Sequence, residues 1–82
     1  MKYKYKIDLI TFKDISDFVK IVEPYTFKVK LTDGDDFCVN AKSLMGAMAT
    51  VEWDNLFCES ENDIYRDIKK YVVQTYDKDS DD

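Results

Sequence analysis

The stretch Asn40-Ala41-Lys42-Ser43-Leu44-Met45-Gly46-Ala47-Met48-Ala49-Thr50 predicts a strand that runs out into a short helix. Ser43 is a good N-cap, because its hydroxyl can accept a hydrogen bond from a free N–H of the first turn. One helical face follows at spacings i, i+3, i+4 and i+7: Leu44, Ala47, Met48 and Val51. Met45 falls beside this face, so the helix is more apolar than a core-facing stripe needs. The pattern fits either a short core helix with an apolar flank or a docking surface beside a helix N-terminus.

The first part of the chain predicts a strand followed by a helix. Tyr, Ile and Leu alternate with Lys and Asp over residues 3–10, which is the period-two pattern of a strand. Thr11 and Asp14 have the spacing of a capping box at a helix start. Apolar residues then recur at helical spacing, and Pro24 ends the pattern. We therefore expect a helix over roughly 12–23.

A hairpin is expected next. Residues 25–32 alternate as a second strand, and Asp33-Gly34-Asp35 predicts a turn in which Gly34 can supply a positive φ. A third strand follows with Phe37 and Val39. An odd-numbered loop would keep these two side chains on the same face as Leu31. The aspartates lack the remaining ligands of a calcium loop, so we interpret them as an acidic turn.

The rest of the chain predicts a helix over 43–51, a short strand over 56–58 and a last helix. Ser60 and Asp63 have the spacing of a helix cap. The inner face of this last helix would be Ile64, Ile68, Tyr71 and Val72. The order is therefore strand, helix, strand, strand, helix, strand, helix. Such a set of amphipathic elements predicts an α+β two-layer sandwich with an antiparallel sheet covered on one face by helices.

The length, composition and charge of the chain limit the classes of function that it can have. The 82 residues are 45% hydrophobic, which is enough for one domain, expected over residues 1–76. Residues 77–82 predict an acidic disordered tail. The formal net charge of −5 argues against nucleic-acid and anionic membrane partners. No apolar run is long enough to span a bilayer. We expect a cytoplasmic protein.

The sequence offers no candidate residues for a metal site, a cofactor site or histidine-based catalysis. Cys38 and Cys58 are far apart in the sequence and there is no histidine, so no metal site and no cofactor are expected. The absence of histidine excludes histidine-based acid–base catalysis. Neither thiol has a sequence-local activating partner, and we expect both to be reduced and partly buried. The sequence does not predict an enzyme.

The segment Lys42–Met48 resembles the regulatory-serine segment of HPr, the phosphocarrier protein of the bacterial sugar phosphotransferase system. That segment typically has the sequence Lys-Ser-Ile-Met-Gly-Val-Met, and this chain has Lys-Ser-Leu-Met-Gly-Ala-Met. The resemblance extends from Tyr3 to about Val73 through the order of elements, and it is strongest over residues 39–48. It implies the HPr-like open-faced two-layer sandwich, βαββαβα.

The resemblance also implies where a phosphocarrier site would lie. HPr carries phosphate on a histidine at the start of its first helix. That position falls on Thr11 here, or on Phe12 with a one-residue shift, and the family's Arg and Pro fall on Lys13 and Asp14. Neither Thr11 nor Phe12 supplies an imidazole, and a phosphothreonine ester is far less labile than a phosphohistidine. We therefore expect a family member that lacks the catalytic histidine and is not a competent phosphohistidine carrier.

A regulatory role remains, also implied by the resemblance. In HPr of Gram-positive bacteria a kinase phosphorylates the serine that corresponds to Ser43, and the modified protein binds a regulator. Ser43 is therefore the expected phosphorylation site. Leu44, Met45 and Met48 match the apolar residues that contact partners, such as an HPr kinase or other phosphotransferase-system proteins. The alternative is a structural interaction domain that reuses the HPr fold, with a surface formed by Trp53, Phe12 and Tyr25.

Overall fold

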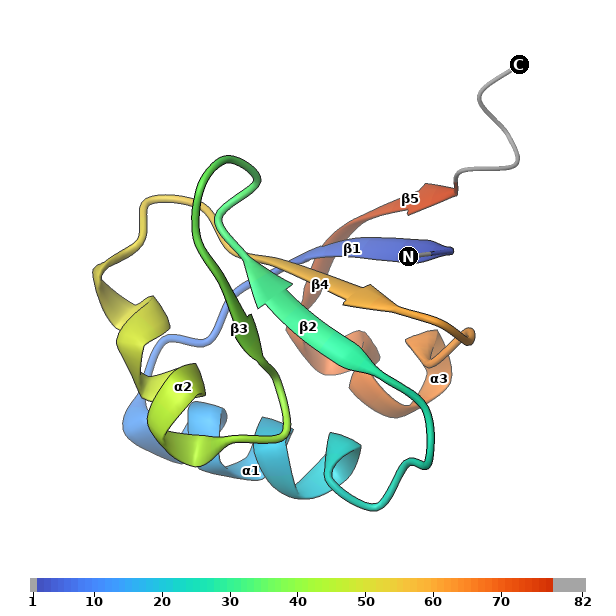
Figure 1. Ribbon diagram of the computed structural model, residues 1–82, viewed down its shortest axis with the longest axis horizontal. Coiled ribbons are helices and arrows are strands. Elements are labelled where there is room, and N and C mark those ends of the chain that lie inside the picture. The colour runs from blue at the N-terminus through green and yellow to red at the C-terminus, as the bar shows by residue number, and fades with distance from the viewer. Residues whose placement is uncertain (1, 78–82) are drawn as a thin grey trace.

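The computed structural model describes residues 2–77, and in it one antiparallel sheet forms a layer that packs against a layer of helices, which lie below the sheet in Figure 1. The strands are β1 (Tyr3–Ile7), β2 (Val29–Thr32), β3 (Cys38–Asn40), β4 (Phe57–Ser60) and β5 (Val72–Asp77). The α-helices are α1 (Phe12–Val22), α2 (Leu44–Met48) and α3 (Tyr65–Ile68), and the 3-10 helices are η1 (Ala49–Glu52) and η2 (Lys69–Tyr71). The sheet order is β3-β2-β4-β1-β5, and every neighbouring pair is antiparallel.

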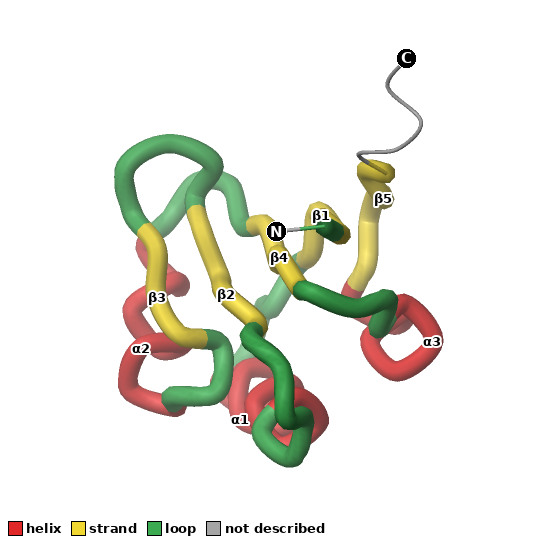
Figure 2. The backbone as a smooth tube through the Cα atoms, turned by 45° about the vertical axis from the view of Figure 1, so that its right-hand side comes forward, coloured by secondary structure: helices red, strands yellow, loops and turns green. Residues whose placement is uncertain are grey.

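The helices lie on one side of the sheet and leave the other side open (Figure 2). Apolar side chains from the inner face of the sheet and from the three α-helices meet in one core. Its largest fully buried members are Phe18, Ile7, Ile15, Leu31 and Ile68. The predicted antiparallel α+β two-layer architecture is confirmed, as is the order of the first seven elements.

Helix α1 forms where the sequence predicts it. The Asp14 N–H donates to the Thr11 hydroxyl at 3.1 Å, and the Thr11 N–H donates back to the Asp14 carboxylate at 3.2 Å, which completes a capping box. Its buried face consists of Ile15, Phe18, Val19 and Val22. The helix ends at Val22, and the C-cap Glu23 still has helical φ and ψ of −55° and −41°. Pro24 therefore does not end the helix by changing the conformation of the residue before it, as the sequence predicts, but because it has no N–H to donate to the preceding turn.

The hairpin between β2 and β3 has a five-residue loop over residues 33–37. The odd length was predicted, and Leu31 lies opposite Val39 in the register. Gly34 has φ +86°, as the turn requires. The Asp33 carboxylate accepts hydrogen bonds from the N–H groups of Asp35 and Phe37 at 2.8 and 3.1 Å, so it closes the loop.

The predicted last helix is wrong in length. Helix α3 spans only Tyr65–Ile68, η2 adds one turn, and from Val72 the chain becomes β5, which pairs with β1. The expected cap at Ser60 is also wrong, because its hydroxyl is buried and accepts from the Asn62 N–H at 3.2 Å. Of the predicted acidic tail, Asp77 belongs to β5 and residues 78–82 lie outside the described part of the chain.

Candidate functional site

Ser43 is the N-cap of α2. Its hydroxyl accepts a hydrogen bond from the Gly46 N–H at 3.1 Å, and its side chain is half-buried. The turn before it is fixed, because the Lys42 ammonium donates to the Tyr25 carbonyl at 2.5 Å and the Lys42 N–H donates to the Asn40 side chain at 2.9 Å. The first turn of α2 has no acidic residue. The predicted strand, cap and short helix are therefore all present.

The face that α2 turns toward the core differs from the predicted one. Ala47 and Thr50 are buried, whereas the longer side chains of the expected inner face point to solvent. The reason is close packing. A Cβ at Gly46 would lie 3.3 Å from the Val39 Cβ, so the helix backbone approaches β3 where only small side chains fit. The buried Thr50 hydroxyl donates to the Ala47 carbonyl at 2.7 Å, which satisfies its polar atom.

Because α2 and η1 pack on the core through Ala47 and Thr50, large apolar side chains along these two helices stay exposed. We call this set the α2 surface. Met45 is 84% exposed, Val51 61%, Met48 42% and Leu44 41%. The helix lies beside α1 (Figure 1), and α1 begins with the exposed Phe12, preceded by the exposed Ile10. Val51 and Ile10 were not predicted as surface residues. Periodicity alone cannot find them, because it does not tell which side of a helix faces the sheet.

Two of the aromatic residues predicted for the alternative surface, Trp53 and Tyr25, each stack on a different aromatic ring. Trp53 stacks on Phe37 with ring centroids 6.0 Å apart, and Phe37 is 60% exposed. Tyr25 stacks on Phe27 at 4.8 Å, and its hydroxyl donates to the Asp67 carboxylate. Burial, with the Asp67 carboxylate beside it, raises the pKa of Tyr25. Trp53 and Tyr25 thus belong to two separate pairs.

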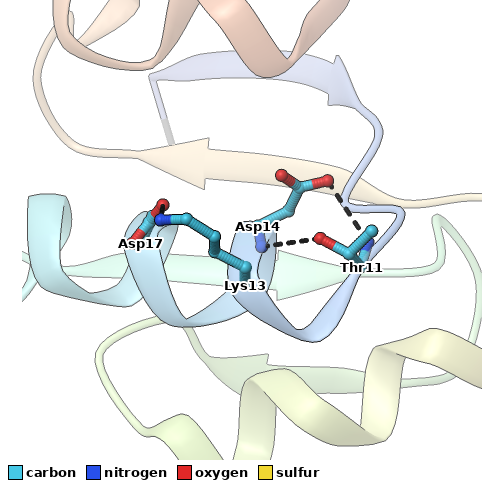
Figure 3. A network of polar contacts seen from close by, with 4 residues as sticks. All are labelled: Thr11, Lys13, Asp14 and Asp17. Carbon is cyan, nitrogen blue, oxygen red and sulfur yellow. Dashed lines mark hydrogen bonds and ion pairs between the residues drawn. The ribbon is translucent and has the colours of Figure 1, made fainter.

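Thr11, the position that matches the family's phosphohistidine, is a helix cap (Figure 3). The Asp14 carboxylate accepts from the N–H groups of Ile10 and Thr11 at 3.1 and 3.2 Å, so it occupies backbone donors at the start of α1. One turn on, Lys13 and Asp17 form an exposed ion pair at 2.8 Å, which lowers the pKa of Asp17 and raises that of Lys13. A phosphoryl group at this end of α1 would compete with a carboxylate already bound there.

The two cysteines are both free thiols in different surroundings. Cys58 on β4 is buried, and this burial raises the pKa of its thiol to about 12, whereas Cys38 on β3 is exposed. The expectation of two partly buried thiols is therefore wrong for Cys38. Within residues 2–77, no group of three or more Cys, Asp or Glu side chains is placed to hold a metal ion. No helix in this part of the chain is long and apolar enough to cross a membrane.

A second polar feature ties α3 to the sheet. The Tyr5 hydroxyl donates to the Asp63 carboxylate at 3.0 Å and accepts from the Ile64 N–H at 3.0 Å. The same carboxylate accepts from the Tyr65 N–H. Burial, together with the Asp63 charge, raises the pKa of Tyr5. A satisfied buried hydroxyl of this kind fixes the start of α3.

Comparison with protein-family models, with curated proteins and with solved structures finds no match to this chain. The residues of the α2 surface and the cap at Ser43 are therefore the observations on which a function can be argued.

Proposed function

We propose that this chain is an HPr-like regulatory module that binds protein partners through the α2 surface and is modified at Ser43. The observation that carries the proposal is the exposure of Leu44, Met45, Met48 and Val51 together on α2 and η1. Contiguous exposed apolar side chains on a small domain mark interaction sites, and methionine adapts to partners of varied shape. The resemblance of Lys42–Met48 to the HPr regulatory segment supports the same surface.

The surroundings of Ser43 favour its phosphorylation. A phosphate on its hydroxyl meets the N-terminal end of α2, where backbone N–H groups and the helix dipole favour negative charge. The absence of acidic residues in that first turn removes one source of repulsion. The new charge would stand next to Leu44 and Met45 in the chain, so it would change the affinity of the α2 surface for an apolar partner. Phosphorylation would thereby act as a switch on binding.

Phosphohistidine transfer is not part of the proposal. The position that matches the family's histidine is Thr11, whose hydroxyl accepts from the Asp14 N–H. The Asp14 carboxylate is bound at the same helix end, where it would repel a phosphoryl group. The proposed role is therefore that of a cytoplasmic phosphotransferase-system regulator and not of an enzyme or carrier.

The first test is the intact mass of the chain after incubation with an HPr kinase and ATP. We expect a gain of one phosphate in the wild type and none in Ser43→Ala. Ser16→Ala, which removes a hydroxyl from α1, should keep the gain and serves as the matched control. A folded wild-type chain that gains no phosphate would contradict the assignment of Ser43.

A second pair of variants tests the α2 surface in the same reaction. Met45→Asp should slow phosphorylation at least several-fold, because the kinase must approach Ser43 across this surface. Val73→Asp places the same charge at an exposed apolar position on β5 and should leave the rate unchanged. Equal rates for both variants and the wild type would remove the α2 surface from the proposal. Circular dichroism checks that each variant is folded.

The second candidate is an interaction domain of the same fold without a phosphotransferase role. The stacked pair Phe37 and Trp53 favours it, because Phe37 is 60% exposed and lies outside the segment Lys42–Met48 that matches the HPr regulatory sequence. A partner that binds Ser43→Ala as well as the wild type, but fails to bind Phe37→Ser, would support this candidate over the first.

A further inference from the structure

We propose that the chain binds the ammonium group of an alkylamine, either a lysine side chain or a free polyamine, in a cavity between the start of α3 and the sheet. The cavity has a volume of about 360 Å³, which lies within the size range of small-ligand pockets. Four of its six lining residues are tyrosines and one is a carboxylate: Tyr3, Tyr5, Tyr65, Tyr76, Asp63 and Thr75. Among residues 2–77, no lysine or arginine lines it.

The strands place part of this lining on the helix-covered side of the sheet. Tyr3 and Tyr5 alternate with Lys4 along β1, and Tyr5 is buried, so both tyrosines lie on the face that packs against the helices. Thr75 lies opposite Tyr5 on β5 and shares that face. Tyr76 lies opposite Lys4 and therefore belongs to the open face. The proposal accordingly depends on the other three tyrosine rings and on the carboxylate.

The Asp63 carboxylate is held in place by one oxygen and offers the other to the cavity. Its Oδ1 accepts hydrogen bonds from the Tyr5 hydroxyl and the Tyr65 N–H, both at 3.0 Å. In the part of the chain that the structure describes, Oδ2 accepts no hydrogen bond and Asp63 forms no ion pair. Because the bonds to Oδ1 already order this side chain, Oδ2 can accept from an ammonium group at little further cost in side-chain entropy.

The tyrosine rings favour a cation at the same place. Tyr65 is 43% exposed, and its ring centroid lies 6.5 Å from that of Tyr5. The face of an aromatic ring attracts an ammonium group within about 6 Å of its centroid. The chain itself makes such a contact at the cavity, because the Lys2 ammonium lies 5.9 Å from the centroid of the Tyr3 ring. The net charge of −5 adds a general attraction for cations.

Oxygen atoms around the cavity favour an ammonium group that carries N–H donors. The hydroxyls of Tyr3, Tyr65 and Thr75 can accept hydrogen bonds in addition to the Asp63 carboxylate. A primary ammonium has three donors and no acceptor, so it can bond to several of these oxygens at once. A quaternary ammonium has no donor to offer them, and the charge of Asp63 repels an anion. The lining therefore favours a primary amine over both.

The test is a titration of the isotope-labelled whole chain with butylamine, followed through the backbone amide signals by two-dimensional NMR. We expect saturable shifts at residues 63–65 and 75, with an affinity that weakens as salt increases, because the site is open to solvent. Butanol, a neutral molecule of similar size, should shift none of these signals. Ser43→Ala should bind butylamine as the wild type does, so this proposal and the one on Ser43 can fail separately.

A matched pair of variants tests the carboxylate. Asp63→Asn removes the charge but keeps an oxygen that accepts from Tyr5 and Tyr65, and it should weaken butylamine binding about fivefold. Asp67→Asn removes a charge from α3 outside the cavity and should change the affinity by less than about twofold. Circular dichroism checks that both variants are folded. Equal effects of the two substitutions would overturn the proposal.

Two further variants test the rings, with opposite signs. Tyr65→Leu should weaken butylamine binding about threefold, because it removes an exposed ring of the lining. Lys2→Ala should strengthen binding, because it removes the cation that competes for the Tyr3 ring. Weaker binding by Lys2→Ala would contradict this competition and overturn the proposal.

Two more ligands distinguish the source of the amine. Tighter binding of Nα-acetyl-lysine amide than of putrescine would assign the cavity to a lysine side chain of a partner protein. Tighter binding of putrescine would assign it to a free polyamine, and either result supports an alkylamine site. A folded wild-type chain that shows no saturable shift at residues 63–65 and 75 with any of the three amines would overturn the proposal.

Discussion

At the scale of single residues, the two cysteines occupy opposite environments in the same sheet. Cys58 lies on the helix-covered face of β4 with no exposed surface, and Cys38 lies exposed on β3. A thiol reacts as its thiolate and only where a reagent can reach it. In the folded protein we therefore expect a chromogenic disulfide reagent at pH 8 to label one thiol rapidly, and the second only after denaturant is added.

The variant Cys38→Ser separates the two thiols. It should abolish rapid labelling in the native state and retain the single thiol that denaturant exposes. Rapid reaction of Cys58 in folded Cys38→Ser would mean that β4 opens readily, which would contradict the burial of this strand between β2 and β1.

At the scale of elements, the capping box of α1 makes a measurable contribution to stability. The Thr11 hydroxyl accepts from the Asp14 N–H, which is otherwise an unsatisfied donor of the first turn. Thr11→Ala should lower the free energy of unfolding by about 1 kcal/mol, measured by urea denaturation. Thr26→Ala, in the exposed turn after α1, is the matched control and should change it by less than about 0.5 kcal/mol. Equal effects of the two substitutions would contradict the assigned cap.

The capping box was predictable because its signal is local. Thr11 and Asp14 need only their spacing and the apolar repeat that follows to define the start of α1. The hairpin loop was equally local, since Gly34 and the aspartates around it specify a turn. By contrast, the inner face of α2 depends on how closely the helix approaches β3. The sequence has Leu44 and Met48 at core-like spacing, but the small residues Gly46 and Ala47 decide which side packs.

The misassigned C-terminal helix has a similar cause. Ile64, Ile68 and Tyr71 are all buried, as the helical spacing predicted, but the spacing is satisfied by one α-turn followed by one 3-10 turn. From Val72 onward the sequence is rich in β-branched and aromatic residues. The outer edge of β1 provides a partner for them, and this tertiary contact overrides the helical pattern. The cap at Ser43 was predicted from the residues alone and is confirmed. The phosphorylation of Ser43 and the partner contacts of its neighbours were implied by the resemblance and stay predictions.

At the scale of the whole molecule, two buried groups, the Cys58 thiol and the Tyr5 hydroxyl, keep their protons to higher pH in the folded state than in the unfolded state. The pKa of the Cys58 thiol rises from 9.0 to about 12, and the pKa of the Tyr5 hydroxyl rises from 10.0, in both cases mainly because of burial. Above about pH 9, the unfolded chain releases these protons while the folded chain keeps them. The folded state then binds more protons than the unfolded state, so the free energy of unfolding falls as pH rises.

We therefore expect stability to be lost in alkali, with each of the two groups adding a slope of up to about 1.4 kcal/mol per pH unit. Urea denaturation from neutral pH to about pH 11 measures the slope. Cys58→Ala should flatten its first part, which begins near the ordinary pKa of a thiol, 9.0. Cys38→Ser removes an exposed thiol and should leave the slope unchanged. A stability that stays constant or rises over this range would mean that water reaches the inner face of the sheet, which would contradict a single sealed core between the sheet and the helices.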